Sequence, residues 1–321
     1  MGFLTRNLDK PGKGVEKEEV EKSSSSSYIT TFTRRFGKFV QLNLAFMIPT
    51  ALILFLCVAV YFAPYYLGMQ YFPMVKFGSA ELNLYDTYVT YLPLILLSIP
   101  YSGAMVVARR LANGDYAFVW NEFAKGVKEN WKPFLINGII CYAFYVMASF
   151  AFLFYLSSVK DNWLFYIPLV FVVIVAVVFI MTQFYVPVMI VSVNIKLRHV
   201  YKNSLILCAA GILKNILFIV IAGIIIAFYI MFVPIMNGTL LIGIILLIVI
   251  VPSFLMYTQA FVFYPVVDLL VIQPYYKKKE EEEGPPPPSK PSLTDYEGIE
   301  ENNSTYVYKD GKLVRIDEEE K

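Results

Sequence analysis

The residue types that most often carry chemistry are scarce in this chain. His199, in the stretch IKLRHVYKN, is the only histidine among 321 residues. An imidazole can relay protons or bind a metal, but a metal site needs several converging ligands. No acid or thiol stands beside His199 in the sequence. The pattern favours an interfacial polar residue over a catalytic or metal-binding one.

Amide side chains lie within or at the ends of long apolar runs, where a polar group needs a partner. They are Gln41, Asn43, Asn137, Gln183 and Gln259. Such amides can line a polar cavity that binds a hydroxylated solute, or they can join helices through hydrogen bonds worth roughly 0.6–2 kcal/mol each. The second role is the commoner one, and the sequence favours it while leaving the first open.

Asp268 is the only carboxylate near the last apolar run. An acid at membrane depth suggests a functional site. The alternative is that Pro265 bends the chain and leaves Asp268 at the membrane surface, near a lysine. We favour this alternative because the cluster Lys277 to Lys279 follows about two helical turns later.

No sequence motif of an ATPase, a zinc protease or a serine hydrolase occurs in the chain. The three cysteines, Cys57, Cys141 and Cys208, stand in apolar surroundings without the spacing of a zinc site or a disulfide framework. We therefore expect no catalytic residue, no metal and no cofactor, and we do not expect an enzyme.

The composition is that of an integral membrane protein. Hydrophobic residues make up 58% of the chain and charged residues 16%, and the mean hydropathy is +0.59. A soluble domain of this size would have too little polar surface to cover its core. The net charge of +2 averages over very uneven segments and indicates no nucleic-acid partner.

Six uncharged runs are long enough to cross about 30 Å of hydrocarbon, which takes roughly 20 helical residues. They are 39–63, 88–108, 134–158, 163–191, 215–236 and 239–267. A turn at Pro234, Asn237 and Gly238 is expected to separate the last two. The sequence therefore predicts an all-α membrane protein with six transmembrane helices.

Lysine and arginine near the span ends predict the orientation, because they concentrate on the cytoplasmic side. One set of flanks holds fifteen of them: Arg34, Arg35, Lys38, Arg109, Arg110, Lys125, Lys128, Lys132, Lys196, Arg198, Lys202, Lys214 and Lys277 to Lys279. The opposite loops hold only Lys76 and Lys160. Both termini are therefore expected in the cytoplasm.

Amphipathic stretches precede three of the spans. In NEFAKGVKENWKPFLING, aromatic residues from Trp120 to Trp131 share one helical face and lysines take another. Such a helix suits the headgroup boundary, so we expect 120–131 to lie parallel to the inner membrane face. Similar stripes occur at 28–39 and 200–214.

The order of these stretches suggests three related helical hairpins. Each would consist of an amphipathic helix, a span, and a second span that contains prolines. The prolines of the second spans are Pro93, Pro100, Pro168, Pro187, Pro252 and Pro265. A true internal repeat is one explanation, and the shared composition of apolar helices is the other.

Both ends differ from the membrane domain, which we place at 28–276. Residues 1–27 are polar, contain a serine run and are expected to be disordered. The acidic, proline-rich tail 277–321 is expected to be an extended spacer. Within it, Asp310-Gly311 in YVYKDGKLVRI predicts a hairpin over 305–316 that pairs Tyr308 with Leu313 and Val307 with Val314.

Three segments resemble the YesL-like family of bacterial integral membrane proteins. They are RRFGKFVQLNLAFMIPTALIL, FAKGVKENWKPFLI and VYKNSLILCAAGILKNILFIVI, and the likeness covers about residues 32–272. The resemblance implies a bacterial cytoplasmic-membrane protein of undefined activity, whose relatives are often encoded beside carbohydrate uptake and breakdown systems. It supplies no site residues, and the family pattern lacks both the insertion near 8–31 and the long tail.

Two functions remain open at this stage. The first is a non-catalytic accessory or regulatory membrane protein, in contact with the lipid bilayer and with a membrane or cytoplasmic partner from a solute-uptake system. The alternative is a small-solute transporter with broken helices and a cavity lined by Gln183, Gln259 and tyrosines. The charge needed to couple transport to an ion is not evident within the spans.

Overall fold

In the part of the chain that the structure describes, the spans predicted from the sequence are helical. The computed structural model describes residues 24–68, 74–77, 80–160, 162–235, 250–276, 281, 306–309 and 312–315. In these residues five helical segments are long and apolar enough to cross a membrane, and a sixth crossing forms when two helices that meet at 88° are taken together. The chain is therefore an all-α membrane protein, as predicted.

Most of the crossings contain more than one element. The elements are α2 (Phe36–Tyr66); α3 (Leu84–Thr87), η2 (Val89–Leu97) and α4 (Ser98–Ala112); α5 (Val119–Ser158); η3 (Trp163–Phe165) and α6 (Tyr166–Ser192); α7 (Leu197–Ala210) and α8 (Ile212–Ile235); and α10 (Val251–Val267) with the π-helical turn η4 (Asp268–Ile272). The sixth predicted span is described only from residue 250, and the turn expected at Asn237 and Gly238 lies outside the described residues.

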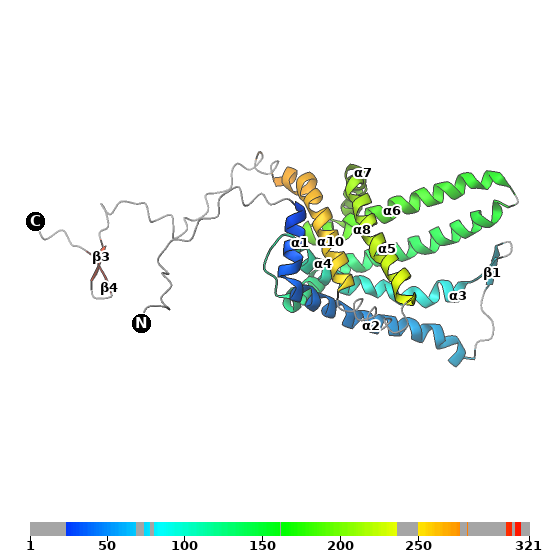
Figure 1. Cartoon of the computed structure of the whole chain (residues 1–321), viewed down its shortest axis with the longest axis horizontal. Helices are drawn as coiled ribbons and strands as arrows, with labels where there is room; N and C mark the ends of the chain where they lie inside the picture. Colours follow the sequence, from blue (N-terminus) through cyan, green and yellow to red (C-terminus); the bar gives the residue numbers. More distant parts are fainter. Residues whose placement is uncertain are drawn as a thin grey trace, which may run out of the picture. The chain divides into compact units, whose positions relative to one another are not determined.

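The second helices of the three predicted hairpins, α4, α6 and α10, pack against one another as an inner layer. Within each hairpin the two helices also touch, since α2 packs on η2, α5 on α6 and α8 on α10. Figure 1 shows α5 and α6 running side by side. The predicted hairpins are thus present as packed pairs.

The hydrophobic core lies at the end of the helices that carries the basic residues. Its largest fully buried side chains include Met105 of α4, Tyr185 and Met189 of α6, and Tyr257 and Phe263 of α10. Toward the opposite end, α5 and α6 expose large apolar side chains. No residue in the most apolar window of α5 is buried, whereas 44% of the corresponding window of α10 is. Away from the core, the far ends of α5 and α6 therefore form an exposed, peripheral arm.

Two of the three amphipathic stretches form separate helices. In α1 (Ser24–Arg34), Tyr28 stacks on Tyr257 of α10, with ring centroids 5.0 Å apart. In the third hairpin, α7 meets α8 at 88°. Because α1 begins at Ser24, the predicted disordered segment 1–27 is too long at its C-terminal end, and residues 1–23 lie outside the described residues.

The third amphipathic stretch does not form a helix of its own. Residues 120–131 are the first part of α5, which continues through Pro133 for 40 residues. The stretch is helical, as expected, but it is continuous with a span, and its angle to the membrane surface stays a prediction. Packing explains the continuity, since Gly126 and Phe134 are buried on the face that meets the inner helices. Trp120 and Trp131 remain exposed.

Two short hairpins complete the described structure. Strand β1 (Met74–Phe77) pairs with β2 (Ala80–Asn83) between the first two spans, and an exposed ion pair joins Lys76 to Glu81 at 2.8 Å. In the separate C-terminal unit, β3 (Tyr306–Lys309) pairs with β4 (Lys312–Arg315). Their register sets Tyr308 opposite Leu313 and Val307 opposite Val314, as the sequence predicts. The turn residues Asp310 and Gly311 lie outside the described part of the chain.

Candidate functional site

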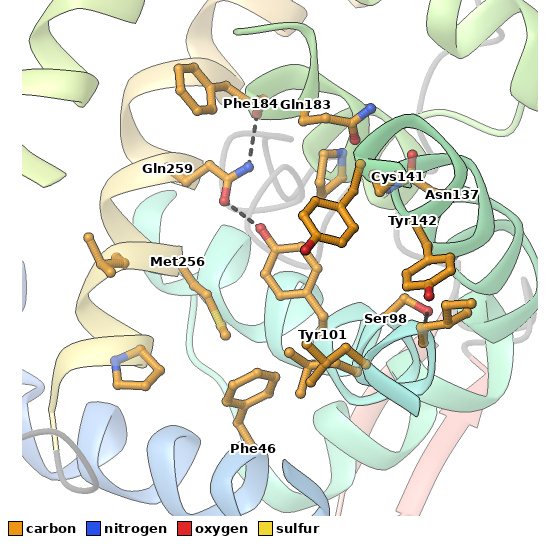
Figure 2. A pocket seen from close by; sticks show the side chains of 18 of the residues that line it. Phe46, Ser98, Tyr101, Asn137, Cys141, Tyr142, Gln183, Phe184, Met256 and Gln259 are labelled. Atoms are coloured by element: carbon orange, nitrogen blue, oxygen red, sulfur yellow. Dashed lines mark hydrogen bonds between the residues drawn. The ribbon is translucent and has the colours of Figure 1, made fainter. Parts of the chain in front are cut away.

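A cavity of about 1010 Å³ lies beside the inner layer of helices. Residues of α2, η2, α4, α5, α6, α8 and α10 line it, as Figure 2 shows for most of its side chains. The described lining is mainly aliphatic and aromatic, and it includes Pro187 and Pro252 from the second and third hairpins. All of its polar groups are hydroxyls, amides and one thiol, so the described wall has no charged side chain.

A first hydrogen-bonded group ties the three inner helices together at the cavity wall. The Tyr101 hydroxyl of α4 donates to Gln259 Oε1 of α10 at 2.5 Å, and Gln259 Nε2 donates to the carbonyl oxygen of Phe184 in α6 at 3.0 Å. Figure 2 shows these two bonds, one at each end of the Gln259 amide. Both ends of the Gln259 amide are therefore used between helices, as the interhelical interpretation predicts.

A second group joins α5, α6 and α7. The Tyr201 hydroxyl donates to Asn137 Oδ1 at 2.5 Å and accepts a hydrogen bond from Gln183 Nε2 at 3.3 Å. Asn137 and Gln183 both line the cavity, and Tyr201 stands behind them. The sequence singled out the two amides but not the tyrosine that connects them.

Asn43 lies apart from the cavity and has a capping role. Its side chain is fully buried on α2, and its Oδ1 accepts a hydrogen bond from the backbone N–H of Ser253 at 2.8 Å. Ser253 is in the first turn of α10, where backbone N–H groups have no partner within the helix. Asn43 therefore caps the N-terminus of α10 from another helix, by accepting a hydrogen bond from a first-turn N–H as an N-cap residue does.

The remaining predicted candidates do not join the cavity. Asp268 is half-buried at the start of the π-helical turn η4, next to the end of α10. His199 is exposed on the first turn of α7. Gln41 is half-buried on α2. Of the amides named from the sequence, the cavity thus brings together Asn137, Gln183 and Gln259.

Three further hydroxyl groups of the cavity wall are also bonded within the protein. The Ser98 hydroxyl donates to the carbonyl oxygen of Ile95 at 2.6 Å, and the Tyr142 hydroxyl donates to that of Tyr88 at 2.5 Å. Tyr145 donates to the carbonyl oxygen of Thr87 at 3.2 Å. Since these donors are occupied, the cavity offers an apolar surface with few free polar contacts, which suits an apolar ligand better than a sugar.

Sequence reasoning missed Tyr101 and Tyr201. Both lie in stretches rich in tyrosine and phenylalanine, where an aromatic belt accounts equally well for each ring. Which tyrosine hydroxyls form hydrogen bonds with an amide depends on how the helices pack, and this is seen only in the structure. In the described residues, no three side chains of histidine, cysteine, aspartate or glutamate lie together as metal ligands would.

Comparisons with protein-family models, with curated proteins and with solved structures give no match to this chain. The fold and the cavity therefore define the class only as a multi-pass helical membrane protein with an apolar cavity.

Proposed function

We propose that this chain is a non-catalytic accessory component of a membrane assembly for solute uptake. One observation carries the proposal: the amides and hydroxyls at the cavity bond one another across five helices, including Tyr101 to Gln259 and Tyr201 to Asn137. Polar groups used in this way hold helices together, and they provide neither the acid–base pair of an enzyme nor a ring of free donors for a hydrophilic solute. Carbohydrate as the solute is suggested only by the YesL-like resemblance.

The peripheral arm supports a role in assembly. On α5 and α6, exposed apolar side chains such as Met147 and Phe171 are about two-thirds accessible, and their surface is not needed for the core. This surface can pack against lipid or against the helices of another membrane protein. We propose the latter as the contact with the uptake system.

The experiment places a photo-crosslinking amino acid at Met147 or Phe171 in the full chain, in native membranes. A matched position at Met105, which is fully buried, serves as the control. We expect crosslinks from the two exposed positions to a membrane subunit of an uptake system, identified by mass spectrometry, and none from the control. Crosslinks to lipid alone would contradict the assembly role.

The second candidate is a transporter acting alone, and the size of the cavity favours it. About 1010 Å³ would hold a small solute, and Pro187 and Pro252 on its wall lie in the inner helices that would have to move. Uptake of labelled sugars by proteoliposomes that contain only this chain separates the two candidates. We expect none, and clear uptake would reverse the ranking.

For orientation we propose a cytoplasmic membrane location with both termini inside, which rests on the positions of the lysines and arginines. Cysteine placed at Lys76, in the first hairpin, should react with an impermeant thiol reagent added outside intact cells. Cysteine placed at Lys128, near the basic end of α5, should not. Both side chains are exposed in the structure, so labelling at Lys128 from outside would refute this orientation.

A further inference from the structure

A second cavity, of about 630 Å³, lies between α6 and helix α7, and Tyr201 separates it from the central cavity. Its floor is apolar and consists of Phe144 from α5 with Ile174, Val175, Val178 and Phe179 from α6. On α6 the groove extends from Ile174 to Thr182, which is about 12 Å of helix. This floor belongs to a membrane span and is exposed at several of its residues.

The wall on α7 has a different character. Arg198 and Lys202 line the groove from positions four residues apart, so they share one face of α7. Both side chains are exposed, and neither forms an ion pair with a carboxylate among the residues described. The described lining of this groove includes no acidic residue. Two cations therefore border an apolar groove without charge compensation.

The two walls together fit one kind of molecule. A hydrocarbon chain would cover Val175 and Val178, while an anionic headgroup would lie against Arg198 and Lys202. A soluble anion would leave the apolar floor empty, and an apolar molecule would leave the cations unpaired. Basic pockets beside transmembrane helices are a known arrangement for binding anionic lipid headgroups.

We propose that this groove, between α6 and α7, binds an anionic phospholipid, with its phosphate at Arg198 and Lys202 and an acyl chain along Ile174 to Phe179. The site does not depend on the function proposed above, because neither Arg198 nor Lys202 belongs to the hydrogen-bonded groups of the central cavity, although Tyr201 stands between the two cavities. It would fix the corner where α7 meets α8 at 88° relative to the membrane surface.

The test uses the full-length protein purified in a non-ionic detergent and measures thermal unfolding and lipid retention by native mass spectrometry. Phosphatidylglycerol should raise the unfolding temperature and remain bound, and phosphatidylcholine and inorganic phosphate should do neither. The variant Arg198→Gln/Lys202→Gln should bind phosphatidylglycerol about 10–30-fold more weakly, from roughly fivefold per cation. Equal binding of phosphatidylcholine, or a full effect of inorganic phosphate, would overturn the lipid assignment.

Two further variants control for charge and for folding. Lys128→Gln/Lys132→Gln removes the same charge from α5 outside the groove and should leave binding within about twofold. Val178→Trp keeps both cations but fills the groove, and it should also lose the lipid. Each variant is compared only when it elutes as a single species in size-exclusion chromatography. Equal loss in the α5 control, or full binding by Val178→Trp, would refute a built site.

Discussion

The crossing of α4 and α5 depends on two glycines, and replacing one of them tests the packing directly. A Cβ atom added at Gly103 would lie 2.5 Å from the backbone carbonyl oxygen of Phe123 and 2.7 Å from Cγ2 of Val127. One added at Gly126 would lie 3.1 Å from the Cα atom of Gly103. Small residues of this kind let helix backbones approach closely in membranes.

The cost of Gly103→Ala follows from these distances. Carbon–oxygen contacts between helices are about 3.3–3.6 Å, so the two backbones would have to separate by nearly 1 Å. Overpacking of this kind costs about 1–3 kcal/mol, and the better helix propensity of alanine returns about 0.5–1 kcal/mol. We expect Gly103→Ala to lower the free energy of unfolding by about 1–2 kcal/mol, because the carbonyl oxygen of Phe123 cannot change rotamer to relieve the clash as a side chain can.

Gly223→Ala is the matched control. Gly223 lies within α8 and a Cβ there would have no atom within 4 Å, so only the propensity gain remains. The two variants should differ by about 2 kcal/mol in the free energy of unfolding. Unfolding in mixed micelles can be followed by tryptophan fluorescence, since Trp120 and Trp131 lie on α5.

The double variant Gly103→Ala/Gly126→Ala sharpens the test. Once the first methyl group has separated the helices, the second should cost less than it does alone. The double variant should therefore lose less unfolding free energy than the sum of the losses of the two single variants. If Gly103→Ala is as stable as Gly223→Ala, the close approach of α4 and α5 is not what holds this end of the domain together, and the reasoning fails.

Two further changes test the interior. A Cβ at Gly211 would lie 2.1 Å from the hydroxyl oxygen of Tyr185, so Gly211→Ala should destabilise the protein by about 1–3 kcal/mol. Adding Tyr185→Phe should restore much of this loss, because it removes a hydroxyl that is buried with no hydrogen-bond partner among the described residues. Unchanged stability of the double variant relative to Gly211→Ala would count against the steric cause. Gln259→Leu should cost about 1–2 kcal/mol, because it leaves the Tyr101 hydroxyl unpaired, and a double-mutant cycle with Tyr101→Phe should show coupling; additive effects would mean that this bond contributes nothing.

The sequence was sufficient for features that depend on local pattern. Run length predicts the spans, because each must cross a fixed thickness of hydrocarbon. The Asp310-Gly311 pair predicts the register of β3 and β4, since a two-residue turn fixes which residues face each other. The same reasoning applied to Gly78-Ser79 would have predicted the β1–β2 hairpin, whose register leaves two residues between Phe77 and Ala80.

Features that depend on how helices meet were not predictable in this way. The sequence favours an interhelical role for the amides of Asn137, Gln183 and Gln259, but their tyrosine partners depend on the rotation and depth of neighbouring helices. The stretch 120–131 is not a separate helix as α1 and α7 are, since α5 continues through Pro133 and packs closely on α4 at Gly126. A hydrophobic stripe predicts that one face of a helix is buried, but it does not identify the helix that packs against it.

The bonds between the two ends of the membrane domain bear on how the protein is made. Asn43 caps a backbone N–H 210 residues further along, and Tyr28 bonds to Thr258 across 230 residues. A ribosome that adds roughly 5–20 residues per second needs about 10–40 s to make that intervening chain. During this interval the bond between Asn43 of α2 and Ser253 of α10 cannot form, because Ser253 has not yet been made. The contacts between the first and last helices of the membrane domain can therefore form only after the last span has been made.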